Sequence, residues 1–167
     1  MKEKQFNLNQ KLKNSNIEKK IILYISLICI AGLIIRFYYT PFGIPVSFDG
    51  FTGYFLYALD ISILGHLPNY TLSQSGWSEF LSLFFMNFHS ENLIDHTDMQ
   101  RTISVILSGI TVIPIYFICK RFFNNYYSLI GATIFAFEPR IILNSTLGVA
   151  EPLYILAISL GILLFLN

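Results

Sequence analysis

The apolar run from Ile21 to Tyr39 is the feature that most constrains this chain, because no charged residue precedes Arg36 within it. A helix needs about 20 apolar residues to cross a hydrocarbon core about 30 Å thick. The run has that length. It is longer than the apolar stretch of a cleaved signal peptide, and no small-residue cleavage site follows it. The run therefore predicts a retained membrane anchor.

Three later apolar runs predict further spans, near residues 102–119, 126–143 and 152–166, which makes about four with the first one near 21–39. Charged residues make up 13% of the chain, against about 25% in soluble domains. We therefore expect an all-α polytopic membrane protein. Because the last run is short for a full crossing, residues 21–167 are expected to be the N-terminal part of a longer transmembrane module.

The charges near the span ends predict one orientation. Residues 1–20 form a lysine-rich segment before the first span, whereas no Lys or Arg occurs from Thr40 to Gln100. Lys120 and Arg121 follow the second span. Since Lys and Arg favour the cytoplasmic side, we expect a cytoplasmic N-terminus and an outer loop over 40–101 in a cell membrane or an ER-like membrane. The basic residues cluster rather than cover a face, so no nucleic-acid partner is expected.

The outer loop is rich in aromatic residues and is predicted to contain short helices. The segment from Phe51 to Gly65 has the composition of a helix lying at the membrane interface. A second short element begins at Trp77, an aromatic residue typical of headgroup depth. Acidic residues follow, and a solvated acidic face is a simpler interpretation of them than metal ligation: Glu91, Asp95 and Asp98.

Two other carboxylates are the candidate catalytic residues, Asp49 and Glu151, and the predicted topology puts both on the outer side. Asp49 precedes Gly50, which permits a sharp turn or a close approach of backbone to ligand. Pro152 suits a helix start, so Glu151 would lie at the positive end of the fourth span. A carboxylate at such a place can accept a proton or bind a metal. The alternative for each is a helix-capping role.

Arg101 and Arg140 are candidate ligands for an anionic headgroup on the outer side. The alternative for both is anchoring at the membrane surface by snorkelling, which is the role expected of Arg36. The three histidines lack the spacing of metal ligands. No nucleotide-binding glycine loop is present.

Several motifs follow one another in a recognisable order along the chain. They are Arg101 opening the second span, Lys120-Arg121-Phe122-Phe123 at the cytoplasmic turn, Ala136-Phe137-Glu138-Pro139 closing the third span and Val149-Ala150-Glu151-Pro152-Leu153 opening the fourth. In these motifs the chain resembles the polyprenyl-phosphate-dependent membrane glycosyltransferases of the GT-C class, specifically the family 39 group of dolichyl-phosphate-mannose–protein mannosyltransferases. Upstream, Asp49 matches the first-loop catalytic aspartate of that class, and SGWSEFLSLFF resembles the aromatic element after it.

This resemblance implies transfer of a sugar from a polyprenyl-phosphate donor on the extracytoplasmic face. Asp49 would be the general base that activates the acceptor hydroxyl. Arg101 or Arg140 would hold the donor phosphate. Glu151 would line the cavity or help to hold a divalent metal, Mg or Mn, and Trp77 would line the cavity.

Three alternatives stay open. Gly50 stands where the family carries the second acid of an Asp-Glu pair, so the acceptor is a protein, a lipid or a glycan. A relative of the oligosaccharyltransferase catalytic subunit is a second enzyme hypothesis, although the Asp-x-Asp metal motif is not found at Asp49. A non-enzymatic membrane subunit or a transporter fragment is the third. The acids at the outer edge favour surface chemistry over transport, which places ionisable groups at mid-membrane.

Overall fold

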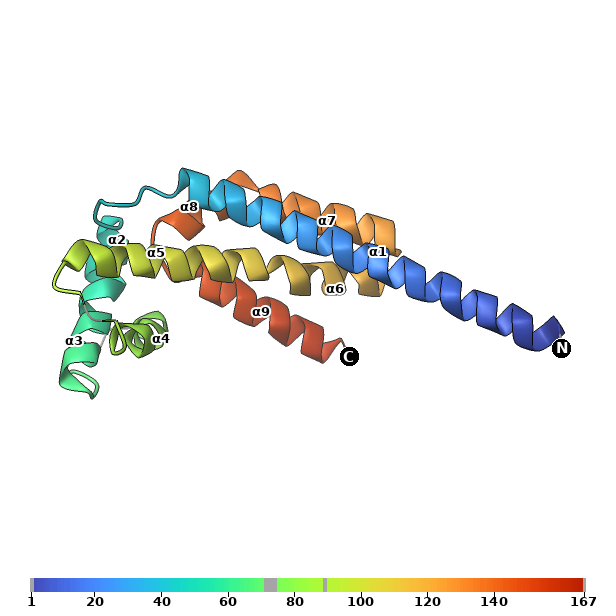
Figure 1. Ribbon diagram of the computed structural model, residues 1–167. Coiled ribbons are helices and arrows are strands. Elements are labelled where there is room, and N and C mark those ends of the chain that lie inside the picture. Colours follow the sequence, from blue (N-terminus) through green and yellow to red (C-terminus); the bar gives the residue numbers. More distant parts are fainter. Residues whose placement is uncertain (1, 71–74, 89, 167) are drawn as a thin grey trace.

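The computed structural model describes residues 2–70, 75–88 and 90–166, with side chains from Glu18 onward. Within these residues every regular element is a helix, which confirms the all-α prediction (Figure 1). The elements are α1 (Lys2–Tyr39), α2 (Phe48–Gly50), the π-helical turn η1 (Phe51–Phe55), α3 (Leu56–Leu64), α4 (Gly76–Phe85), α5 (Leu93–Ile110), α6 (Val112–Phe122), α7 (Asn125–Phe137), α8 (Pro139–Thr146) and α9 (Glu151–Phe165).

Two helical stretches are long and apolar enough to cross a membrane, Glu18–Tyr39 and Leu93–Phe122. They coincide with the first two predicted spans, but the second helix begins at Leu93 and not at Thr102. Asn92 starts it, because its side-chain oxygen accepts from the Ile94 N–H at 3.0 Å. Residues 93–101 were predicted to be outer loop and instead form the first turns of α5.

The second stretch changes its hydrogen bonding at Thr111, where α5 passes into α6. Pro114 has no N–H, so the Ile110 carbonyl lacks its usual donor four residues later. The Thr111 hydroxyl meanwhile donates to the Leu107 carbonyl at 2.7 Å. The proline is tolerated as expected, and its effect is limited to the interruption between α5 and α6 at Thr111.

The predicted span over 126–143 is broken in two. The chain is extended at Glu138 (φ −62°, ψ 118°), which ends α7 at Phe137 and starts α8 at Pro139. The cause is local: a proline disfavours helical geometry in the residue before it. A single continuous third helix was therefore the wrong expectation, although both halves are helical.

Arg36 ties three helices together near this break. Its side chain is fully buried, and its Nη1 donates to the Ala136 carbonyl of α7 at 2.8 Å. Its Nε donates to the Ser108 hydroxyl of α5 at 3.0 Å. The Ala136 carbonyl is among the last of α7, which have no helical donor, so Arg36 caps that helix. Anchoring by snorkelling was the wrong prediction for this residue.

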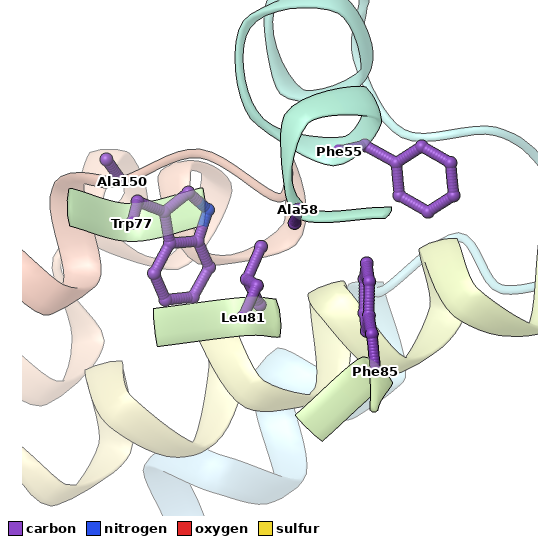
Figure 2. Close-up of a cluster of buried hydrophobic side chains, with 6 residues drawn as sticks. All are labelled: Phe55, Ala58, Trp77, Leu81, Phe85 and Ala150. Carbon is purple, nitrogen blue, oxygen red and sulfur yellow. The ribbon is translucent and has the colours of Figure 1, made fainter. Parts of the chain in front are cut away.

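The elements α2 to α4 gather at the end of the bundle away from the N-terminus (Figure 1). The helix predicted over Phe51 to Gly65 is present as η1 and α3, and α4 is the predicted element at Trp77. Their shared core is aromatic, with Phe55 above Phe85 and with Leu81 beside Trp77 (Figure 2). Ala150, just before α9, contacts the same core and so joins this end to the bundle.

Candidate functional site

The candidate site is built on a contact between two turns that are far apart in sequence. Ser47 caps α2, since its hydroxyl oxygen accepts from the Gly50 N–H at 3.2 Å. The same hydroxyl donates to the Leu147 carbonyl at 3.0 Å. A Cβ on Gly50 would lie 2.8 Å from that carbonyl, so only glycine permits this approach. The turn that carries Asp49 therefore rests directly on the turn before α9.

A buried glutamine fastens the two turns together. Gln100 on α5 is fully buried, and its Nε2 donates to the Gly50 carbonyl at 3.2 Å and to the Gly148 carbonyl. Gly148 has φ +72°, a conformation that L side chains rarely adopt. Its carbonyl also accepts from Trp77 Nε1 at 3.4 Å. One backbone carbonyl thus joins α4, α5 and the turn before α9.

Asp49 and Glu151 are both exposed, and each occupies the first turn of its helix. Ser47, not Asp49, is the residue that caps α2, and the cap of α9 is Ala150. Neither carboxylate is therefore taken up by capping, which was the alternative to a functional role. Asp49 lies beside the 147–148 turn and Glu151 follows it, so the structure brings their segments together.

The pKa of the Tyr54 phenol responds to the charges of both segments. Burial raises the pKa of its phenol above the usual value, and the negative charges of Glu151 and then Asp49 raise it further. Tyr154 contributes between these two acids. Because electrostatic effects of this kind fall off with distance, the phenol lies within range of both carboxylates. The phenol consequently stays neutral over the physiological pH range.

Asp49, Glu151 and Tyr54 together form what we call the carboxylate cluster. Arg101 does not face this cluster as a free cation. Its side chain is 2% exposed, and each guanidinium nitrogen donates within the chain. Nε donates to the Thr146 carbonyl at 3.2 Å, and Nη2 donates to the Pro45 carbonyl at 2.6 Å. Nη1 donates to the Ile44 carbonyl and pairs with Asp98 at 3.3 Å. Arg101 thus holds the 44–45 loop against the end of α8, and this arrangement presents no open edge to a phosphate.

Arg140, in contrast, is exposed and forms no ion pair with any described residue. It lies in the first turn of α8, next to an apolar groove of about 400 Å³ lined by Tyr39, Pro139, Ile142, Leu143 and Thr146. The helix rises 1.5 Å per residue, so about 10 Å of axis separates Arg140 from the turn at Leu147. The structure therefore does not bring this arginine into direct contact with the carboxylate cluster.

Trp77 is a core residue and not a cavity-lining one. It is fully buried, packed against Leu81 and Ala150 in the cluster of Figure 2. The prediction that Trp77 lines an open cavity is not what this packing favours, because no face of the indole is left exposed. An aromatic-rich segment also arises where helices cover one another, and the sequence alone does not separate the two cases.

Comparison of this chain with protein-family models, with curated proteins and with solved structures found no match. The carboxylate cluster must therefore be interpreted from its own geometry.

No group of three or more His, Cys, Asp or Glu side chains that could hold a metal ion occurs among the described residues. Mg²⁺ in proteins is commonly held by one or two carboxylates, with waters and substrate phosphates completing its octahedron. Asp49 and Glu151 are therefore the residues that would hold such an ion, and the ion would supply positive charge to the donor phosphate. We derive no step through a metal.

Three residues that shape the site were not predicted as site residues: Ser47, Tyr54 and Gln100. Ser47 precedes a short turn and is a common capping residue, so a cap there could have been expected. Tyr54 is one of many aromatic residues in its loop, and Gln100 is a polar residue beside Arg101. Their roles arise from contacts between distant segments, which no local pattern encodes.

Proposed function

We propose that this chain is the N-terminal part of a membrane-embedded glycosyltransferase that transfers a sugar from a polyprenyl-phosphate donor to an acceptor on the extracytoplasmic face. The contact between the Ser47–Gly50 turn and Gly148 carries this proposal. It assembles two exposed carboxylates and a neutral phenol at one end of the bundle, as a transferase with a general base requires.

Asp49 is the general base in this proposal. Its carboxylate accepts the proton of the acceptor hydroxyl while that oxygen bonds to the anomeric carbon of the sugar. The bond from the anomeric carbon to the phosphate oxygen breaks, and its electron pair leaves with polyprenyl phosphate. A positioned general base contributes about 10²–10⁴-fold to such a rate. Glu151, exposed at the start of α9 beside the same contact, orients the acceptor.

Arg140 is the better of the two arginine candidates for the donor phosphate. It is exposed and unpaired among the described residues, and the groove beside Pro139 offers apolar contacts to a prenyl chain. The nitrogens of Arg101 are already bonded to backbone carbonyls. The anomeric carbon is bonded directly to the phosphate, so this assignment requires the long Arg140 side chain and the donor phosphate together to cover the about 10 Å of α8 between Arg140 and the carboxylates.

The same proposal includes four membrane crossings, with α7 and α9 as the third and fourth. Both expose large apolar side chains as lipid-facing helices do: Ile130, Ile134, Ile158, Leu160 and Leu164. At 1.5 Å per residue, α7 and α9 extend about 20 Å and 22 Å, which requires local thinning of the bilayer. The helices α3 and α4 then lie at the outer interface, and the basic N-terminus is cytoplasmic.

The decisive experiment expresses the full reading frame in membranes and measures transfer from radiolabelled polyprenyl-phosphate sugars. Asp49→Asn should lower the transfer rate about 10²–10⁴-fold at unchanged protein level. Glu91→Gln, which neutralises an exposed acid outside the cluster, is the matched control and should retain full activity. Equal transfer by wild type and Asp49→Asn would remove Asp49 from the mechanism.

A non-enzymatic membrane subunit is the second candidate. The observation that favours it is that Arg101 and Trp77 both serve the fold, which leaves fewer side chains for substrate. Under this alternative the full reading frame transfers no sugar from any polyprenyl-phosphate donor. Asp49→Asn would then change neither a transfer rate nor the amount of folded protein.

A further inference from the structure

A second cleft lies between α6 and α9, at the end of the bundle away from the carboxylate cluster. It encloses about 480 Å³ and is lined by Phe117, Lys120, Arg121 and Leu163. Because α9 starts at Glu151, about 18 Å of helix separates the cleft from that acid. The cleft is therefore a separate site, which the transfer reaction does not use.

The cleft carries an uncompensated positive charge. Lys120 and Arg121 are exposed, and neither forms an ion pair with a residue that the structure describes. None of its four lining residues is acidic. Both cations lie in the last turn of α6, whose dipole supplies roughly half a negative charge there. Two full positive charges exceed this half charge, so the cleft attracts an anion.

The apolar part of the cleft lies deeper than its charges. Phe117 lies one helical turn before Lys120 on α6. It is therefore about 4.5 Å closer to the middle of the apolar stretch Leu93–Phe122. Leu163, on α9, forms the facing wall. Cations at the rim and an aromatic and an aliphatic side chain below them match an amphiphile with an anionic head and a hydrocarbon tail. Free phosphate would use only the rim.

We propose that this cleft binds an anionic phospholipid, with the lipid phosphate on Lys120 and Arg121 and an acyl chain along Phe117 and Leu163. Basic pockets between membrane helices commonly hold anionic headgroups in this way. Bound lipid fills the wedge between α6 and α9 and fixes the position of α9. The site needs only that Leu93–Phe122 crosses a membrane, so it stands independently of the proposed glycosyl transfer.

Native mass spectrometry of the detergent-purified full chain tests this site, with phosphatidylglycerol and phosphatidylcholine of identical acyl chains as probes. Wild type should bind phosphatidylglycerol at least about tenfold more tightly than phosphatidylcholine. The double variant Lys120→Gln/Arg121→Gln should weaken that binding about thirtyfold, since each cation near a headgroup contributes about 1 kcal/mol, which is roughly a fivefold step. The charge-conserving pair Lys120→Arg/Arg121→Lys should retain it, which excludes a folding defect as the cause.

Two further variants separate this cleft from general surface charge and from a free-phosphate site. Lys19→Gln removes an exposed cation outside the cleft and should leave lipid binding unchanged. Leu163→Gln should weaken binding of the long-chain lipid without changing the weak binding of inorganic phosphate. Equal affinity for both lipids, or equal loss in Lys19→Gln, would overturn the proposal. So would binding that Leu163→Gln leaves intact, since the acyl chain would then lie elsewhere.

Discussion

At the scale of single residues, Arg36 shows how a charge is kept inside an apolar bundle. It has no acidic partner among the described residues, and its cost of burial is offset by carbonyl and hydroxyl acceptors on three helices. Two of these acceptors, on Ala136 and Ser108, belong to other helices. Ionisable residues inside membrane segments are rare and usually have a specific partner. Here the partner is the open C-terminal end of α7.

We predict that Arg36→Leu lowers the free energy of unfolding by about 3–5 kcal/mol. Hydrogen bonds to a charged group contribute about 1.5–3 kcal/mol each, and two interhelical ones are lost. Arg36→Lys should recover only part of the lost free energy of unfolding, because one ammonium group does not reproduce the planar set of donors on a guanidinium group. Unfolding in mixed micelles, followed by helical circular dichroism, measures both variants. Arg140→Leu is the control, since it removes an exposed cation and should change stability little.

If Arg36→Leu unfolded at the same denaturant concentration as wild type, the arginine would not support the end of α7. The Ala136 carbonyl would then be satisfied in another way, and the buried position of Arg36 would have to be explained by function.

At the scale of helices, α1 and α5 approach each other closely at Gly109. Gly109 is fully enclosed, and a Cβ there would overlap the side chain of Leu33. Small residues at such crossings let membrane helices approach closely. The contact places Arg36, one turn after Leu33, within reach of Ser108. The glycine and the arginine are thus two parts of one helix crossing.

We predict that Gly109→Ala lowers the free energy of unfolding by about 1–3 kcal/mol, the usual cost of overpacking a filled core. Gly161→Ala in α9 is the matched control, because nothing lies within 4 Å of its added Cβ. The control should be neutral or slightly stabilising, since alanine is the better helix former. Detergent-solubilised protein would be compared by thermal unfolding. Equal behaviour of the two variants would mean that α1 and α5 are not in close contact at Gly109.

The helices could be predicted from sequence wherever one local rule dominates. The apolar run after Lys20 forms a helix as expected, and the break at Glu138 follows from Pro139, whose effect was underestimated. The early start of α5 was not predictable in this way. Its first turns carry polar residues such as Gln100 and Arg101, which resemble a loop in sequence but are buried against the 44–50 segment and the turn before α9. Tertiary contact overrides local polarity there.

The sequence predicted which segments lie near the candidate site, but not which side chains are free to act there. Charge bias placed Asp49 and Glu151 on one side of the membrane in the predicted topology, and the structure brings their segments together through Gly148. The same reason explains why Arg101 and Trp77, both candidate site residues, are buried against the chain itself. A sequence shows that a side chain has donors or apolar area, but it does not show whether the chain itself already satisfies them.

At the scale of the whole molecule, the lysines among the described residues lie at one end of the bundle, whereas Arg101 and Arg140 lie with the carboxylates at the other. Lys19, Lys20, Lys120 and Arg121 lie toward one end, whereas Asp49 and Glu151 lie at the other. Under the positive-inside rule this asymmetry corresponds to one orientation of the proposed four-span arrangement. The rule also assigns each connecting segment to a side. The α6–α7 turn is then cytoplasmic, and α2 and α8 are extracytoplasmic.

We predict that a membrane-impermeant maleimide labels cysteines at α2 and α8 in intact cells, and labels a cysteine at the α6–α7 turn only after permeabilisation. The positions are Phe48, Leu143 and Tyr126, which are 80%, 57% and 77% exposed, so access to the reagent depends on the membrane and not on burial. Cys29 and Cys119 are first replaced by serine to remove background labelling. Labelling of Tyr126→Cys and Leu143→Cys on the same side would mean that α7 does not cross, because those positions flank it. The short length of α7, about 20 Å, makes this pair the most demanding test of the arrangement.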